Sequence, residues 1–248
     1  MSKTLFIADL HLHRDRDDIT DLFCHFLEND AIGCDALYIL GDLFEVWFGD
    51  DNPCPMIKRV SERLKALNDT GVPIYYIHGN RDFTIGKRFC KQSGMILLPE
   101  SKVIDLYGTP TLIMHGDSLC TRDVAYQKFR KRSRNPIIKF LLLSLPFKTR
   151  QKIAGDIRNK SKASNKKISL EIMDVTQSEV EKDMTNAGVQ LLIHGHTHRP
   201  DRHHFDLNGQ PAERIVLGDW YDQGSSLVVT KDGMSLENQA FISPKVTT

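Results

Sequence analysis

The 248-residue sequence has no pair of closely spaced cysteines. Its five cysteines are odd in number and scattered, and none lies in a Cys-x-x-Cys motif: Cys24, Cys34, Cys54, Cys90 and Cys120. Neither a disulfide framework nor a zinc ribbon is therefore indicated, and a reducing cytoplasm is the compartment that fits best. The sequence also lacks internal repeats and low-complexity tracts, so we expect a single domain, residues 1–248, with an insertion.

The sequence also lacks an export signal and a membrane-spanning run. Its first apolar residues, 4–8, have the pattern of a β-strand, without the basic region, longer apolar stretch and cleavage site of a signal peptide. An apolar run at residues 140–147 is far shorter than the roughly 20 helical residues that cross a bilayer. We therefore expect a cytoplasmic protein.

Net charge is nearly absent, but its distribution is uneven. The whole chain has 33 Lys and Arg against 32 Asp and Glu, whereas residues 128–167 hold 14 bases and one acid, Asp156. That stretch carries +13 and the rest of the chain −12. A concentrated basic segment indicates contact with an anionic partner, although a solvated helical face is an alternative.

The order of apolar patterns predicts an α/β fold. Short β-rich runs alternate with segments of helical spacing at residues 19–27 and 57–67, as in layered α/β sheets. Residues from about 122 to 186 are helical and basic, and strands return after them. The expected strands are residues 4–8, 36–40, 74–77, 111–114, 190–193, 214–217, 226–230 and 234–239. The helical insertion thus interrupts the α/β body, and we expect it to act as a cap.

Polar side chains follow five of these strands, where open α/β sheets bind their ligands. Asp9 and His11 are two residues apart in an extended segment, so their side chains point the same way. A single histidine at a strand end is more often structural. Here, however, several polar residues each follow a strand, and such a combination could hardly arise by chance. In chain order it comprises Asp9, His11, Asp42, Asn80, His115, His196 and His198.

This ordered set resembles the calcineurin-like metallophosphoesterases over nearly the whole chain. The resemblance implies a layered β-sheet sandwich flanked by helices and a site for two ions bridged by Asp42. It also implies that Asp9, His11, Asp42 and His198 hold one ion, and that Asp42, Asn80, His115 and His196 hold the other. Mixed carboxylate, amide and imidazole donors, together with the family precedent, favour two Mn²⁺ per chain. Such ions activate a water and neutralise phosphate charge.

One position departs from the family pattern. The family usually has histidine after the asparagine of the Gly-Asn motif, whereas this chain has Arg81. Arginine stays cationic near neutral pH and cannot act as a general acid, but it binds phosphate by two parallel hydrogen bonds. We therefore expect Arg81 and Asp42 to be the catalytic residues, with Arg81 orienting the substrate and stabilising its charge.

Four stretches, residues 6–12, 37–44, 78–83 and 193–200, are similar to one branch of the family. Members of that branch hydrolyse UDP-2,3-diacylglucosamine to UMP and 2,3-diacylglucosamine 1-phosphate in lipid A biosynthesis, by water attack on the α-phosphorus at the cytoplasmic face of the inner membrane. The resemblance implies substrate contacts at Asn80, Arg81, Asp123, Ser161, Asn165 and His196. A lysine expected at Ile168 is absent, and Lys166 or Lys167 is its alternative.

The apolar run in the insertion admits two readings. Flanked by Lys139 and Lys148, it can cover acyl chains or rest on an anionic membrane surface as a peripheral contact, or it can pack as an ordinary helix. A phosphoesterase acting on nucleic acid or a soluble nucleotide is the alternative function. The insertion does not interleave aromatic and basic residues regularly, so we expect no nucleic-acid partner. A scaffold without catalysis should lack a ligand, and none is missing. No obligate protein partner is predicted.

Overall fold

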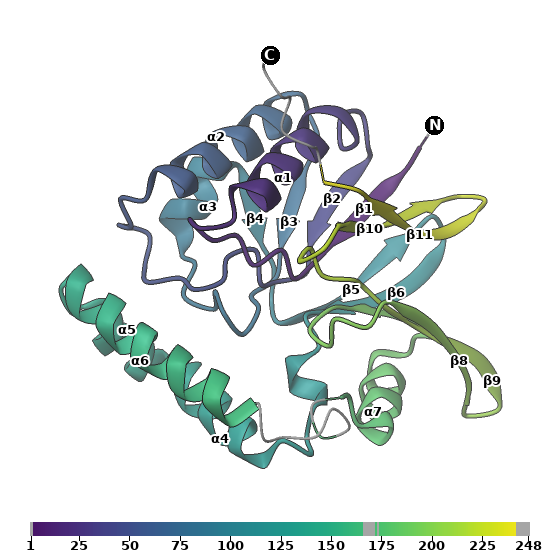
Figure 1. Cartoon of the computed structure of the whole chain (residues 1–248). Coiled ribbons are helices and arrows are strands. Elements are labelled where there is room, and N and C mark those ends of the chain that lie inside the picture. Colours follow the sequence, from purple (N-terminus) through teal and green to yellow (C-terminus); the bar gives the residue numbers. More distant parts are fainter. Residues whose placement is uncertain (1, 166–171, 173, 242–248) are drawn as a thin grey trace.

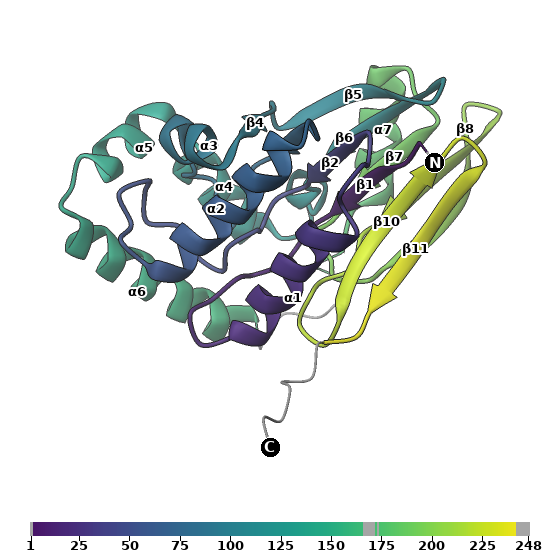
Figure 2. The same cartoon turned by 90° about the horizontal axis from the view of Figure 1, so that it is seen from above.

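The computed structural model describes residues 2–165, 172 and 174–241, and it describes side chains outside residues 158–165. Two β-sheets lie face to face, with helices on their outer faces (Figures 1 and 2). Apolar side chains from both sheets fill the space between them, including Phe6, Ile113, Ile193 and Leu227. The expected α/β class and layered sandwich are therefore confirmed.

The first sheet carries the N-terminal motifs. Its strands run in the order β11-β10-β1-β2-β3-β4. Strands β1 to β4 are parallel to one another, and β10 is antiparallel to both β1 and β11. Parallel strands place their carboxyl ends at the same edge of a sheet. The strands are β1 (Thr4–Ile7), β2 (Ala36–Ile39), β3 (Ile74–Tyr76), β4 (Met95–Leu97), β10 (Gly224–Thr230) and β11 (Gly233–Gln239).

The second sheet carries the C-terminal histidine motifs. Its order is β5-β6-β7-β9-β8, with β6, β7 and β9 parallel and the two outer strands antiparallel. The carboxyl ends of β6 and β7 thus lie side by side. The strands are β5 (Ser101–Leu106), β6 (Thr109–Met114), β7 (Leu191–His194), β8 (Asp201–Leu207) and β9 (Gln210–Val216).

Amphipathic helices cover both outer faces. Helices α1 (Asp17–Asn29), α2 (Pro55–Asp69) and α3 (Lys87–Ser93) pack on the first sheet, where Leu22 and Phe23 are fully buried. Helix α7 (Gln177–Ala187) packs on the second sheet. Because α7 is part of this outer layer, the region expected as an insertion at 122–186 divides between the body and the three helices before α7.

Those three helices form an arm beside the body (Figure 1): α4 (Val124–Ser133), α5 (Pro136–Leu143) and α6 (Phe147–Asn165). Helices α4 and α5 contain no fully buried residue, so hydrophobic packing contributes little to their position. Basic side chains attach the arm instead. Lys139 Nζ donates to Phe83 O at 2.7 Å, and Arg150 Nη1 donates to Phe48 O at 2.6 Å. Part of the positive charge of this segment is therefore structural.

The strands expected from the sequence are present. Helix α3 and strands β4, β5 and β8 were not predicted. The first two are short, with seven and three residues, and β5 and β8 are mostly solvent-exposed with polar residues in them. Such segments carry a weak periodic signal, because edge positions do not require an apolar face.

Candidate metal centre

The loops that follow β1 and β2 are joined by backbone hydrogen bonds. Asp9 N donates to Gly41 O at 3.1 Å, and His11 N donates to Asp42 O at 2.9 Å. From the second sheet, Gly195 N donates to His115 O at 2.9 Å, and His196 N donates to Asp9 Oδ2 at 2.8 Å. The carboxyl ends of both sheets thereby meet at one place.

An unusual backbone conformation is concentrated here. In the described part of the chain, seven non-glycine residues have positive φ, and five of them are predicted ligands: Asp9, His11, Asp42, His196 and His198. A left-handed conformation costs an L-residue about 1–2 kcal/mol, less for Asp and His than for bulkier types. Strain of this kind persists where surrounding structure holds it, commonly at functional sites.

Glycines allow the loops to approach this closely. A Cβ on Gly79 would lie 2.0 Å from Asp42 Oδ1, and one on Gly195 would lie 2.4 Å from Asp9 Oδ2. No side chain fits in either position. Both glycines are therefore required by the close packing of the carboxylates that the sequence marks as ligands.

The first group of predicted ligands converges around Asp9. His11 Nε2 and His198 Nε2 are 3.2 Å apart, and Asp9 Oδ1 is 3.4 Å from His198 Nε2. His11 Nε2 is 3.8 Å from Asp42 Oδ2. Asp9 Oδ1 is buried and makes no hydrogen bond within the described residues. Such a set of mostly buried lone-pair donors fits a divalent cation.

The second group shares Asp42 and lies around Asn80. Asn80 Oδ1 is 3.0 Å from His115 Nε2 and 2.9 Å from His196 Nδ1, and His115 Nε2 is 3.8 Å from Asp42 Oδ1. One amide oxygen thus faces two imidazoles beside a buried carboxylate. Asp9, Asp42 and His115 also place donor atoms within 4.8 Å of one another. The predicted ligands form two overlapping sets that fit two cations.

The environment of the cluster shifts the pKa values of two of its histidines in opposite directions. Burial opposes charging of His198, but the carboxylates of Asp9 and Asp219 outweigh it and raise the pKa of His198 to about 10. Burial lowers the pKa of His196 to about 3. A cation shared by these groups satisfies the same carboxylates while leaving the imidazoles neutral, as metal ligation requires.

Arg81 lies at the edge of the cluster. Its Nε is 3.9 Å from Asp42 Oδ2, and its backbone N donates to Asp42 Oδ1 at 2.8 Å. Arg81 Nε is buried without a hydrogen-bond partner in the described structure. The adjacent Asp82 is fully buried and accepts hydrogen bonds from three backbone amides: Gly79 at 3.0 Å, Phe44 at 3.2 Å and Asp42 at 3.3 Å. Asp82 therefore holds the two loops together.

Asp117 connects the cluster to the helical arm. This buried carboxylate accepts from Tyr126 Oη at 2.6 Å, Arg130 Nε at 2.8 Å and Arg134 Nη2 at 3.0 Å, all on or just after α4. Arg134 also donates to Gly79 O at 3.2 Å. Burial raises the pKa of Asp117, but the two guanidinium groups and His115 outweigh it, and the pKa lies well below the usual range. The arm is thus fixed to loops that carry the predicted ligands.

The remaining predicted substrate contacts are spread along the segment between β6 and α7. Asp123 accepts from Tyr126 N at 2.8 Å and forms the N-cap of α4. Ser161 and Asn165 lie in α6, but their side chains are outside the described residues, as are Lys166, Lys167 and Ile168. The structure therefore brings the seven predicted metal ligands together with Arg81, while Asp123 has a structural role at a helix end.

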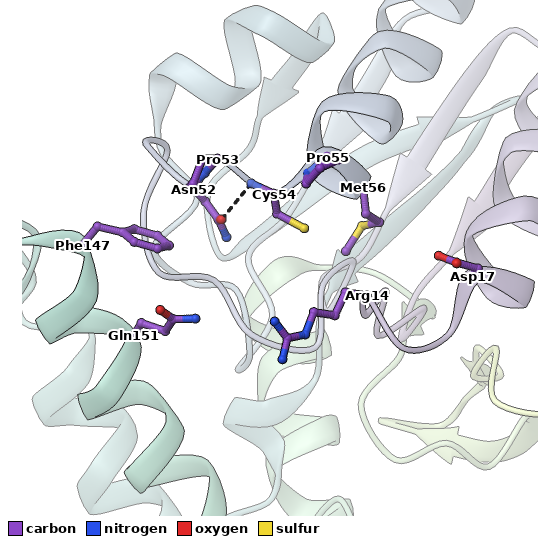
Figure 3. A pocket seen from close by; sticks show the side chains of 9 residues that line it. All are labelled: Arg14, Asp17, Asn52, Pro53, Cys54, Pro55, Met56, Phe147 and Gln151. Atoms are coloured by element: carbon purple, nitrogen blue, oxygen red, sulfur yellow. Dashed lines mark hydrogen bonds between the residues drawn. The ribbon is translucent and has the colours of Figure 1, made fainter.

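An open groove lies at the junction of α6 and the body (Figure 3). Its volume is about 470 Å³, and Phe147 and Gln151 of α6 face Asn52 and Met56 across it. None of the predicted ligands is among its lining residues. The groove therefore belongs to the seam between arm and body.

Two carboxylates that lie at the cluster were not predicted from the sequence. Glu45 Oε2 is 3.1 Å from His11 Nδ1, and Asp219 Oδ2 is 3.2 Å from His198 Nδ1. Asp219 has the signal that identified Asp42, because Gly218-Asp219 follows strand β9 as Gly41-Asp42 follows β2. Glu45 has no such signal, since it lies in a loop three residues after Asp42.

Comparison with known proteins gives the same family as the sequence motifs. Residues 2–200 match the family model of the calcineurin-like phosphoesterases. The chain is 55% identical over 238 residues to a UDP-2,3-diacylglucosamine hydrolase of Photobacterium profundum, covering 96% of this chain and 97% of the relative. Proteins of the same description in Enterobacter sp. (strain 638) and Vibrio parahaemolyticus are 54% and 50% identical, over 94% and 96% of this chain and 97% and 98% of their own lengths. This chain belongs to the calcineurin-like phosphoesterase family.

Proposed function

We propose that this protein hydrolyses the pyrophosphate bond of UDP-2,3-diacylglucosamine, releasing UMP and 2,3-diacylglucosamine 1-phosphate for lipid A biosynthesis. The observation that carries the proposal is 55% identity over nearly the full length of a relative described as a hydrolase of this substrate. The buried cluster of carboxylate, amide and imidazole donors supports the same chemistry.

The site residues have distinct roles in the proposed reaction. Asp9, His11, Asp42 and His198 would hold one Mn²⁺, and Asp42, Asn80, His115 and His196 the other. When bound, such a pair of ions supplies an activated water and neutralises phosphate charge. The Arg81 guanidinium lies beside Asp42 and its side chain is 20% exposed, so it would orient the phosphate and stabilise its charge. Attack on the α-phosphorus expels the sugar 1-phosphate, a phosphate monoester that needs no proton on leaving, which suits a site with arginine at this position.

The arm would act as the cap over the lipid half of the substrate. It is held to the ligand loops through Asp117, Gly79 and Phe83, so groups on its inner side lie next to the reaction site. Asp123, Ser161 and Asn165 lie in this segment and are the proposed additional substrate contacts, together with Asn80, Arg81 and His196.

Cleavage in ¹⁸O-labelled water tests the function. Purified protein with Mn²⁺ should convert detergent-dispersed UDP-2,3-diacylglucosamine into labelled UMP and unlabelled sugar phosphate, and EDTA should abolish turnover. Mass spectrometry of both products locates the label. Label in the sugar phosphate would show that water attacks the other phosphorus. Turnover of a generic phosphodiester or a nucleic acid, with no cleavage of the lipid, would contradict the proposed substrate.

We also propose that α5 rests on an anionic membrane surface, at the cytoplasmic face of the inner membrane. In the described residues, no helix combines the length and apolar character needed to cross a bilayer. Helix α5 nevertheless exposes large apolar side chains, with Ile137 at 69% and Phe140 at 70% of their surface. Such side chains beside basic groups favour an interfacial position.

Replacing Phe140 with glutamate should weaken binding to vesicles containing anionic phospholipid by at least about tenfold, since burying a Phe side chain contributes about 1.5–3 kcal/mol. Vesicle flotation measures the effect. Ile32→Glu is the matched control, because Ile32 is 53% exposed on the body, outside the arm. Equal binding of wild type and Phe140→Glu would exclude α5 as the membrane contact.

A further inference from the structure

Two carboxylates stand behind the histidines of the first proposed ion. His11 Nδ1 is 3.1 Å from Glu45 Oε2, and His198 Nδ1 is 3.2 Å from Asp219 Oδ2. The His11 side chain is 1% exposed and that of Glu45 17%, so this pair is shielded from water. His198 and Asp219 are 28% and 25% exposed. Each carboxylate lies on the side of its imidazole away from the ligand cluster.

These contacts determine which ring nitrogen can bind a metal ion. A carboxylate oxygen at these distances favours a proton on the ring nitrogen that faces it, so we expect Nδ1 of each histidine to carry the proton. The lone pair of a neutral imidazole is then on Nε2. In the structure, the two Nε2 atoms face each other at 3.2 Å, and both approach Asp9 Oδ1, at 3.9 Å from His11 and 3.4 Å from His198.

An aromatic ring restrains the same two imidazoles. The Tyr221 ring stacks on His11, with centroids 5.2 Å apart and planes 5° apart, and its centroid is 5.7 Å from that of His198. Tyr221 follows Asp219 by two residues. One short loop therefore supplies both a carboxylate and a ring to the His11 and His198 pair.

The histidines of the second proposed ion have different partners. His115 Nδ1 lies 2.7 Å from the backbone oxygen of Leu40. His196 Nδ1 lies 2.9 Å from Asn80 Oδ1. Neither of these contacts is with a carboxylate. Carboxylate support is thus a distinguishing feature of the His11 and His198 pair.

We infer that Glu45 and Asp219 are positioning residues that hold His11 and His198 as Nε2 ligands with Nδ1 protonated. The inference rests on the proposed assignment of both histidines to one ion. A carboxylate behind a ligating histidine fixes its tautomer and orientation and increases its basicity, and loss of such a partner typically lowers metal affinity about 10–100-fold.

The test is to titrate the metal-free, full-length protein with Mn²⁺ and to measure the heat of binding by calorimetry. Wild type should show two binding events. Glu45→Gln and Asp219→Asn keep an oxygen acceptor but remove the charge, and each should weaken one event about 10–100-fold while the other changes less than about twofold. Glu62→Gln, at an exposed position of α2, is the matched control and should leave both events unchanged. Unchanged binding in both variants, or equal weakening of both events, would overturn the inference.

A measurement on the wild-type protein gives a second criterion that needs no variant to fold. In ¹⁵N-histidine spectra of the protein loaded with Zn²⁺, a diamagnetic probe, His11 and His198 should show protonated Nδ1 and metal-bound Nε2. Metal-bound Nδ1 at either histidine would overturn the inference. If both tests give the expected result but UDP-2,3-diacylglucosamine is not cleaved, the positioning roles stand and the proposed function fails.

Discussion

Replacing Asp42 with asparagine is expected to lower kcat by at least about 10³-fold. In the proposed site, Asp42 is shared by both ions, and two-metal charge stabilisation contributes several kcal/mol, of which about 4 kcal/mol corresponds to 10³-fold in rate. Asparagine offers one amide oxygen and no charge, so it cannot bridge two cations equally well. Steady-state kinetics with saturating Mn²⁺ measures the loss.

The same substitution should not destabilise the metal-free protein. Burial raises the pKa of Asp42, and a carboxyl whose pKa is raised on folding reduces stability at any pH above its unfolded value. Asparagine tolerates the φ of 52° and keeps an oxygen for the hydrogen bond from Arg81 N. The melting temperature of Asp42→Asn in EDTA should thus equal or exceed that of the wild type.

The exposed-turn variant Asp232→Asn provides the control and should behave as wild type in both assays. If the kcat of Asp42→Asn were within tenfold of the wild-type value, Asp42 could not be the ligand shared by both ions. A markedly lower melting temperature in EDTA would show instead that the carboxylate is needed for folding.

Gly79→Ala is expected to reduce kcat/KM by about 10²-fold or more and to lower the melting temperature. The added Cβ would lie 2.0 Å from Asp42 Oδ1 and 2.3 Å from Asp42 N, so the carboxylate or its loop must move. A displacement of about 1 Å in a reacting group can cost 10²-fold in rate, and overpacking typically costs about 1–3 kcal/mol of stability. Kinetics and thermal melting of the same preparation measure both effects.

Gly155 offers a matched control for the added methyl group. It lies in α6, and a Cβ there would meet nothing within 4 Å. Gly155→Ala should raise stability by up to about 1 kcal/mol through helix propensity and retain activity. Wild-type kinetics in Gly79→Ala would mean that the Asp42 loop can relax without disturbing the proposed site.

The excess of basic residues in the insertion has more than one cause. Its excess of Lys and Arg indicated an anionic partner, yet Arg130 and Arg134 form ion pairs with the buried Asp117, and Arg150 pairs with Asp51. These cations attach the arm to the body. The proposal of an anionic membrane contact therefore depends on the exposed remainder, such as Lys148, rather than on the total charge.

The predicted ligands could be selected from the sequence because their signal is local. Asp9, Asp42 and His115 each lie within three residues of the end of a strand, and strands can be recognised from their apolar runs. Parallel β1, β2 and β3 must end at the same edge, so their following residues are brought together by topology alone. The sequence by itself thus determined the fold class and the residues that gather at the cluster.

Only the tertiary structure decides which side chains contact those residues. Glu45 and Asp219 are 34 and 21 residues from the histidines they contact in the chain, and no spacing rule links them. The N-cap role of Asp123 and the anchoring role of Asp117 likewise follow from how α4 is placed. Strand ends are local consequences of hydrophobic pattern, whereas hydrogen bonds between loops depend on side-chain directions that exist after the two sheets and the arm have packed.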